Sequence, residues 1–331
     1  MGRPDPRASA LRGRGTACAT HRREHLRGGR PVRWLRPLGL LLLGLLAACG
    51  PQAAAPAPGK PKAVATISII ADFARQVAQD RVDVSSLLPV GTDPHTYEPV
   101  PRDVQKIAEA RILFYNGLKL EKWLEKLIEN AGGTPIMVEV TRGLRPAIQE
   151  SGRYRGDPDP HLWMDPVFAK RYVENIRDAL IAFDPAGRAT YEANAARYLR
   201  ELETLHRWIQ QQVAQIPPER RKLVTTHDAF RYFGHRYGFK VVGTIWGIST
   251  EDEPSAQEIA RLVEAIRRER VPAVFVETTI NPKLMERVAR EAGVRIGPKL
   301  YGDSLGPPGS GADTYVGMMR HNVRAIVEAL R

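Results

Sequence analysis

Cysteine is scarce: only Cys18 and Cys49 occur in 331 residues. If a leader ending at Ala48 is removed, one cysteine remains. The mature chain can then form neither an internal disulfide nor a thiolate metal site. The folded part must be held by its hydrophobic cores and by any bound ion.

The N-terminal apolar run, residues 38–48, is too short to cross a bilayer. It follows Arg33 and Arg36, as the core of a signal peptide does. The run ends in LAAC at 46–49, which resembles the bacterial lipoprotein cleavage box and implies lipid attachment at Cys49. The alternative is an ordinary signal peptide cut near Ala48. We expect 1–48 to be leader and lipoprotein signal peptide, and the Pro/Ala-rich 49–62 to be a flexible tether.

Basic charge is concentrated in the leader. The whole chain has a formal charge of +12, but residues 1–48 hold ten arginines against Asp5 and Glu24. The remainder holds 39 Lys and Arg against 35 Asp and Glu, a balance of +4. A nucleic-acid-binding protein needs a basic stripe in its folded part. This composition therefore argues against a nucleic-acid partner.

Short apolar runs alternate with helical patterns, which indicates an α/β fold with mostly parallel sheets. Strands are predicted at 63–70, 82–89, 112–115, 136–140, 223–226, 240–245, 273–277 and within 295–301. Helices are predicted at 72–79, 99–110, 120–130, 166–183, 186–215, 229–237, 255–269, 282–292 and 314–330. Residues 143–160 are predicted to form a polar loop. The sheet pattern thus occurs in two blocks.

The helical pattern at 186–215 separates these blocks. Its apolar residues recur every three or four positions, and at about 1.5 Å per residue it spans about 45 Å. No Gly or Pro interrupts it from Ala189 to Ile216. We therefore predict an N-terminal lobe at 63–185, a long rigid connecting helix at 186–216 and a C-terminal lobe at 217–331.

Four candidate ligands follow strand-like or loop segments: His95, His161, His227 and Asp303. His95 is predicted to open a helix after a strand. Three imidazoles and a carboxylate complete the ligand shell of a divalent transition metal. Singly, the histidines could be helix caps or buried hydrogen-bonded residues, and Asp303 could start a turn. Together they predict one metal site at the strand ends, where open α/β sheets bind ligands.

Five segments resemble the zinc/manganese-type substrate-binding lipoproteins of ABC transporters, the TroA-like periplasmic binding proteins. The segments are DPHTYEP at 93–99, YNGL at 115–118, DPHLWMDP at 159–166, FVETT at 275–279 and YGDSLG at 301–306. The resemblance covers about 64–330 and implies two α/β lobes joined by one long rigid helix. It implies that the metal lies between the lobes, on His95, His161, His227 and Asp303.

The resemblance also implies the partners and the cargo. We expect a monomer on the outer face of the membrane, anchored at Cys49, that delivers Mn²⁺ or Zn²⁺ to an ABC permease and its ATPase. Manganese is favoured over zinc, because the 143–160 loop lacks the His-rich insertion of zinc-type members. The GISTE segment at 247–251 also resembles manganese-type members. Because a bound histidine must be deprotonated, capture is expected to weaken below about pH 6.5.

Two further residues are candidates for orienting the ligands. Glu277 ends an apolar strand and either holds a ligand or is a charge compensated by a helix terminus. Asn116, which follows Phe114-Tyr115, is a candidate for the same orienting role. His206, His235 and His321 are expected to be background residues.

Two other functional classes are open to test. A zinc hydrolase would keep a coordination position for water and a nearby general base. Four protein ligands would fill a tetrahedral zinc, and the sequence has no His-Glu-x-x-His helix, so we expect no enzyme activity. A surface adhesin lipoprotein is the second alternative; no repeat or aromatic binding stripe supports it.

Overall fold

The computed structural model describes residues 59–331. The predicted leader, Cys49 and most of the tether lie outside the described residues. None of the helices in 59–331 is both long and apolar enough to cross a membrane.

The first half of the described chain builds a four-stranded parallel sheet. Its strands are β1 (Lys62–Ala65), β2 (Asp83–Ser86), β3 (Ile112–Tyr115) and β4 (Ile136–Glu139), in the order β2-β1-β3-β4. Three helices accompany them: α1 (Ser68–Ala78), α2 (Pro101–Glu109) and α3 (Leu124–Ala131). β1 and β3, the two central strands, are almost wholly buried, as expected for a parallel sheet with helices over it.

Two sequence predictions in this region are wrong in detail. The strand predicted at 63–70 ends at Ala65, and α1 begins at Ser68. Nine of the eleven residues of α1 are buried. The segment therefore has no clear polar face, and a continuous apolar run does not distinguish a buried helix from a buried strand. His95 does not open a helix either. It lies in the loop between β2 and α2, where Pro94 and Pro99 disfavour helix in the residues before them.

The second half builds shorter parallel strand pairs. β5 (Lys222–Thr225) pairs with β6 (Lys240–Thr244), and β7 (Ala273–Val274) pairs with β8 (Arg295–Ile296). The Phe275 amide donates to the Val224 carbonyl at 2.9 Å, which joins β7 to β5. The accompanying helices are α6 (Arg231–Tyr237), α7 (Ala256–Glu269), α8 (Lys283–Ala292) and α9 (Tyr315–Leu330).

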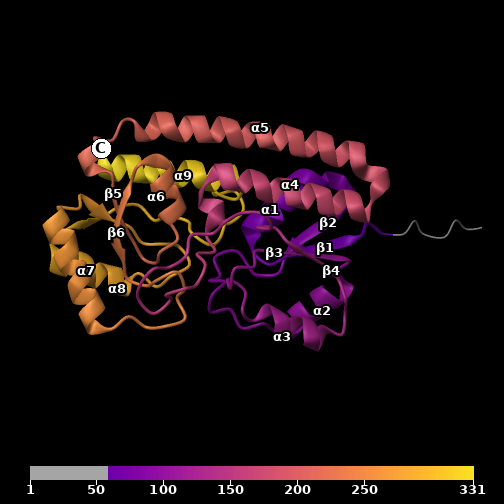
Figure 1. Ribbon diagram of the computed structural model, residues 1–331, viewed down its shortest axis with the longest axis horizontal. Helices are drawn as coiled ribbons and strands as arrows, with labels where there is room; N and C mark the ends of the chain where they lie inside the picture. The colour runs from indigo at the N-terminus through magenta and orange to yellow at the C-terminus, as the bar shows by residue number, and fades with distance from the viewer. Residues whose placement is uncertain (1–58) are drawn as a thin grey trace, which may run out of the picture. The chain divides into compact units, whose positions relative to one another are not determined.

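Two long helices lie in the sequence between the four-stranded sheet and the shorter strand pairs. α4 spans Pro166–Phe183 and α5 spans Arg188–Val213. α5 packs against α1 and α4 and, further along, against α6 and α9 (Figure 1). Every predicted core position of α5 is buried: Tyr191, Ala195, Tyr198, Leu202, Leu205, Ile209 and Val213. The α/β class, the parallel sheets and the long helix are confirmed. The lobe boundaries 63–185, 186–216 and 217–331 stay a prediction.

The hydrophobic core has two parts. One extends from β1 and β3 through α1, α4 and α5 to α6 and α9. The other lies among β5, β7, α7 and α8. The first part therefore supports both ends of the long helix and positions the loops between the sheets.

Candidate metal centre

The structure brings His95, His161, His227 and Asp303 together. Each contributes one ligand atom to a group in which all the atoms lie within 4.8 Å of one another. His95 comes from the loop after β2, and His161 precedes the short 3-10 helix Leu162–Met164. His227 follows β5, and Asp303 lies between β8 and α9. All four are buried, with His95 the most exposed at 5%.

The spacing of these atoms fits a metal shell. His161 Nε2 lies 3.3 Å from His95 Nε2 and 3.2 Å from His227 Nε2. Asp303 Oδ2 lies 3.1 Å from His227 Nε2 and 3.5 Å from His95 Nε2, and Oδ1 lies 3.6 Å from His161 Nε2. A tetrahedron with metal–nitrogen bonds of about 2.0–2.1 Å has ligand atoms about 3.4 Å apart. The four side chains thus surround a space of the size of one ion.

Asp303 supplies the negative charge of this space. Apart from the candidate-ligand imidazoles, no donor of residues 59–331 is hydrogen bonded to either of its buried carboxylate oxygens. A buried polar atom without a partner is costly unless something else satisfies it. Burial, the largest influence, would raise the pKa of Asp303, but His227, His161 and His95 outweigh it and hold that pKa far below its usual value.

The histidines differ in their electrostatics. Burial lowers the pKa of His95 well below its ordinary value, because an imidazolium would lose its hydration there. Burial acts in the same direction on His227, but the carboxylates of Asp303 and Glu277 outweigh it and raise the pKa of His227 well above its ordinary value. Such perturbed groups cluster at functional sites.

Neighbouring carboxylates lie within hydrogen-bond distance of two of the three imidazoles. His161 Nδ1 lies 2.8 Å from Asp159 Oδ1, and His227 Nδ1 lies 2.8 Å from Glu277 Oε2. The His227 backbone amide also donates to Glu277 Oε1 at 2.8 Å. In both histidines Nε2 is therefore left to face the centre. A carboxylate behind a metal-binding imidazole fixes its ring and raises its basicity.

The tripeptide Asp-Pro-His occurs at both His95 and His161, and it forms the same local turn. The His95 amide donates to Asp93 Oδ1 at 2.9 Å, and the His161 amide donates to Asp159 Oδ1 at 3.1 Å. An aspartate that accepts from the backbone two residues on is an Asx turn. Sequence reasoning singled out the histidines and missed the aspartates, although the repeated tripeptide was the available signal.

Asn116 holds the chain just before His161. Its amide nitrogen donates to the Pro160 carbonyl at 3.0 Å, and its oxygen accepts from the Tyr172 hydroxyl at 2.8 Å. Asn116 is fully buried. Its place agrees with an orienting role, which stays a prediction, as does the role of Glu277.

Gly302 is required where it stands. A Cβ atom there would lie 2.3 Å from Glu277 Oε2 and 3.4 Å from His227 Cε1. The Gly302 carbonyl accepts from Trp163 Nε1 at 3.1 Å. The glycine thus lets the Asp303 loop approach Glu277 and His227 closely. It was not identified from the sequence.

The other histidines of the described chain lie outside the centre. His206 Nδ1 is hydrogen bonded to the Tyr237 hydroxyl at 3.0 Å, and His321 Nε2 to the Lys299 carbonyl at 3.0 Å. His235 is exposed on α6. None of the three belongs to the ligand group.

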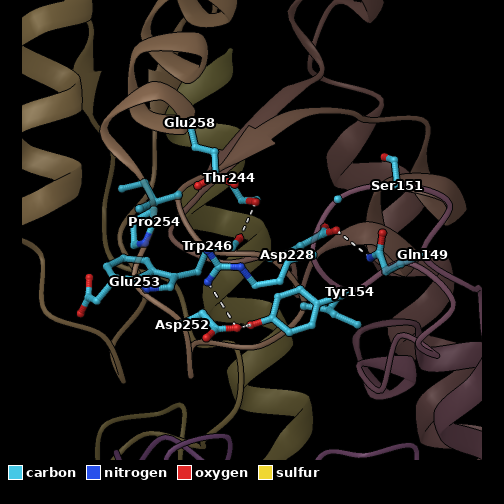
Figure 2. Close-up of a pocket in the computed structure, with 15 residues that line it drawn as sticks. Gln149, Ser151, Tyr154, Asp228, Thr244, Trp246, Asp252, Glu253, Pro254 and Glu258 are labelled. Atoms are coloured by element: carbon cyan, nitrogen blue, oxygen red, sulfur yellow. Dashed lines mark hydrogen bonds and ion pairs between the residues drawn. The ribbon is translucent and has the colours of Figure 1, made fainter.

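Little open space lies beside the four candidate ligands. A cavity of about 210 Å³ lies between the 149–154 loop and residues 244–258, and the four candidate ligands do not line it. In Figure 2 the Gln149 amide faces Asp228, to which it donates at 3.3 Å. His95 lines a space of only about 10 Å³. All four side chains are buried, so the candidate metal centre is enclosed by protein.

Comparison with known proteins identifies the family. The family model described as "ZnuA: Zinc-uptake complex component A periplasmic" matches residues 63–329. The chain belongs to this family. Among curated ZnuA relatives, the manganese-binding lipoprotein MntA of Halalkalibacterium halodurans is 42% identical over 270 residues, covering 81% of this chain and 88% of MntA. The metal ABC transporter substrate-binding lipoprotein FimA of Streptococcus parasanguinis is 38% identical over 296 residues, covering 88% and 95%.

Solved structures agree with this membership in the ZnuA family. The periplasmic zinc-binding protein TroA of Treponema pallidum superposes with a TM-score of 0.77 and 33% identity, covering 82% of this chain and 99% of TroA. The manganese-bound periplasmic metal-binding protein of Candidatus Liberibacter asiaticus gives a TM-score of 0.73 and 30% identity, covering 82% and 100%.

Proposed function

We propose that this protein is the extracytoplasmic substrate-binding component of an ABC importer, which captures a divalent transition metal ion and delivers it to a membrane permease and its ATPase. The observation that carries the proposal is the buried group of three Nε2 atoms around Asp303, whose oxygens have no other hydrogen-bond donor within residues 59–331. A cation supplies the missing partner of that carboxylate. The relatives named as metal transporter lipoproteins support the same role.

Export and anchoring belong to the same proposal. The relatives' names describe lipoproteins, which supports lipid attachment at Cys49 and a position outside the cytoplasm. We expect a monomer tethered to the membrane and no nucleic-acid partner.

Manganese is the proposed cargo, ahead of zinc. Imidazoles suit zinc, whereas carboxylate oxygens suit manganese. Both oxygens of Asp303 approach the histidines, at 3.1 Å for Oδ2 and 3.6 Å for Oδ1, so this carboxylate is placed to offer two ligand atoms. Among the relatives, MntA is named a manganese-binding lipoprotein, and PsaA of Streptococcus anginosus is named a manganese ABC transporter substrate-binding lipoprotein.

Transport fits the site better than catalysis. A catalytic zinc keeps one open position for water, whereas structural sites are closed by four protein ligands. The proposed site has four candidate ligands, which are all buried and lie close together. Hydrolysis would need a water position that this arrangement does not offer.

The ligands also suggest how capture is coupled to shape. His95 and His161 come from the proposed N-terminal lobe at 63–185, and His227 and Asp303 from the proposed C-terminal lobe at 217–331. Neither half alone has a complete shell, so the ion becomes a contact between the halves. α5, without internal Gly or Pro, is expected to limit their relative movement.

Metal analysis tests the proposal. We expect one equivalent of a transition metal, mainly manganese, in the protein purified from its native host and measured by inductively coupled plasma mass spectrometry. The His227→Ala variant should retain little, and His235→Ala, which changes a distant histidine, should retain all. Full metal content in His227→Ala would remove His227 from the ligand shell. A metal-free wild-type protein that also fails to bind added Mn²⁺ or Zn²⁺ would contradict the transport function.

A further inference from the structure

Glu121 is a buried carboxylate that is not itself a candidate metal ligand. It is 8% exposed and lies between β3 and α3. Its Oε1 accepts from the Thr66 hydroxyl at 2.6 Å and from the Asn116 amide at 2.8 Å, and its Oε2 accepts from the Gly117 amide at 3.0 Å. Three donors therefore converge on this one carboxylate.

The backbone held by Glu121 is strained. Gly117, Leu118 and Lys119 have consecutive φ values of +77°, +55° and +66°. Leucine and lysine rarely adopt positive φ, and such conformations persist only where surrounding contacts impose them. The two backbone hydrogen bonds to Glu121 fix the start of this turn. Strain maintained in this way is typical of functional sites.

The turn reaches the metal centre through Asn116. The Asn116 backbone amide is held by Glu121, and its side chain donates to the Pro160 carbonyl at 3.0 Å. Pro160 directly precedes His161. A short chain of hydrogen bonds thus runs from Glu121 to the residue next to a candidate ligand.

Glu121 is also connected, through Thr66, to the segment that leads to His95. Its partner Thr66 accepts from the Leu88 amide at 3.0 Å through its carbonyl, at the start of the loop that carries His95. Leu118 and Lys119 of the strained turn line the small space at His95. One carboxylate is therefore connected to both histidines of the first half.

Stability alone does not account for a carboxylate here. Burial raises the pKa of Glu121 to about 7, although its three hydrogen bonds favour the ionised form. Two tyrosines, Tyr115 and Tyr172, lie near it. The lysines next to it in the sequence pair with other carboxylates, Lys119 with Asp157 and Lys122 with Glu251. What the carboxylate provides is two acceptor oxygens for three donors.

We propose that Glu121 is a positioning residue for the metal site: by holding the Asn116–Gly117 backbone it fixes the Pro160 carbonyl and, through it, the His161 imidazole. This inference rests on the proposed function. Without Glu121 the turn relaxes, Asn116 moves, and the His161 ring loses the orientation that a preformed shell needs.

The test is Glu121→Gln in the full chain, purified in detergent. Glutamine keeps the shape but places an NH₂ group against one of the donors. We expect the dissociation constant for Mn²⁺ to rise by about 10-fold, the lower end for residues that support a metal ligand. The visible absorption of the Co²⁺-loaded protein should also change, because it reports the coordination geometry, which a merely structural loss would leave alone.

Asp72→Asn is the matched control. Asp72 is also buried and accepts three hydrogen bonds, from the Tyr315 amide and the Gln76 and Tyr198 side chains, none of which is a candidate ligand. This variant should lower stability and leave the Co²⁺ spectrum unchanged. A Glu121→Gln protein with wild-type Mn²⁺ affinity and Co²⁺ spectrum would overturn the proposal.

A second variant tests the connection and remains available if Glu121→Gln does not fold. Asn116→Ala removes the bond to Pro160 and should weaken Mn²⁺ binding to a similar degree. In the double variant the two effects should not add, since they act on one path. Wild-type affinity in Asn116→Ala, or full additivity, would overturn the path through Pro160. Wild-type protein that binds no metal would instead contradict the proposed function.

Discussion

The residues that hold the candidate ligands are as specific as the ligands themselves. Glu277 contacts His227 twice, through the backbone amide at 2.8 Å and through Nδ1 at 2.8 Å. Gly302 leaves room for that carboxylate. Because Glu277 contacts both the backbone amide and the ring Nδ1 of His227, Nε2 faces Asp303, at 3.1 Å from Oδ2. The centre is thus preorganised on this side.

We predict that Glu277→Gln weakens metal binding about 10- to 100-fold, the usual range for a carboxylate behind a metal-binding histidine. The amide cannot accept at both Oε positions, so the His227 ring loses part of its orientation. Competition with a chelator of known affinity measures the effect. Glu264→Gln, on the exposed face of α7, should bind as the wild type does. Equal affinities for both variants would show that Glu277 does not orient His227.

The raised pKa of Glu121 predicts that the free energy of unfolding depends on pH. Burial raises its pKa from 4.5 to about 7 in the fold. Between these pH values the folded state keeps a proton that the unfolded state has released, so this contribution to stability falls as pH rises. It is complete below about pH 4.5 and lost above about pH 7, and amounts to about 3 kcal/mol at 1.36 kcal/mol per pH unit.

Urea unfolding of wild type and Glu121→Gln from pH 4.5 to 8 measures this contribution. Glutamine does not titrate, so other groups cancel in the difference between the two proteins. The wild type should lose stability relative to the variant as pH rises. A difference that is constant across this range would show that Glu121 is ionised in the fold throughout.

At the scale of elements, the sequence specifies a helix well when its ends carry local signals. α4 begins at Pro166 behind the cap of Asp165, whose side chain accepts from the Val167 amide, and it ends at Phe183 as predicted. Local signals were missing at the β1–α1 junction, where both elements are buried and equally apolar. There the boundary depends on packing that residues far along the chain provide.

The same distinction applies to the candidate site. His95 and His161 could be predicted because each follows an Asp-Pro dipeptide, in the segments 93–99 and 159–166. Glu121 could not, because its importance depends on Thr66, which is 55 residues away, and on a strained turn that local propensity disfavours. Gly302 likewise matters only because the fold places Glu277 against it. Sequence patterns therefore predict the candidate metal ligands better than the residues that position them.

The packing of α5 gives an element-scale prediction. Leu202 is fully buried in the continuous core between α5 and its neighbours. Leu202→Ala should lower the free energy of unfolding by about 2–5 kcal/mol through lost burial and a residual cavity. Gln211→Ala, on the exposed face of the same helix, should change it by less than about 0.5 kcal/mol. Denaturant unfolding compares the two, and similar values would show that α5 is not fixed by this core.

Over the whole molecule, contacts around the site join the two halves of the chain. Thr250 donates to Asp93 at 2.6 Å, and Lys122 pairs with Glu251. On another side, the Leu305 amide donates to the Ser68 hydroxyl at 2.9 Å. These contacts are individually modest, because exposed ion pairs and single hydrogen bonds contribute about 1 kcal/mol or less. The proposed metal shell would add a stronger polar contact between the halves to the hydrophobic core that they already share.

Metal binding should therefore appear as stability of the whole fold. A ligand that binds only the folded state stabilises it by about 2.7 kcal/mol at 100 times its dissociation constant. For a protein of this size, that corresponds to a rise of about 5 °C in melting temperature. Differential scanning calorimetry of wild type with and without Mn²⁺ measures the shift. Asp303→Asn keeps the shape of the side chain but removes the charge that faces the three Nε2 atoms, so its shift should largely disappear. An equal shift in Asp303→Asn would mean that the stabilising ion binds elsewhere, because an ion held in this shell cannot be indifferent to its single carboxylate.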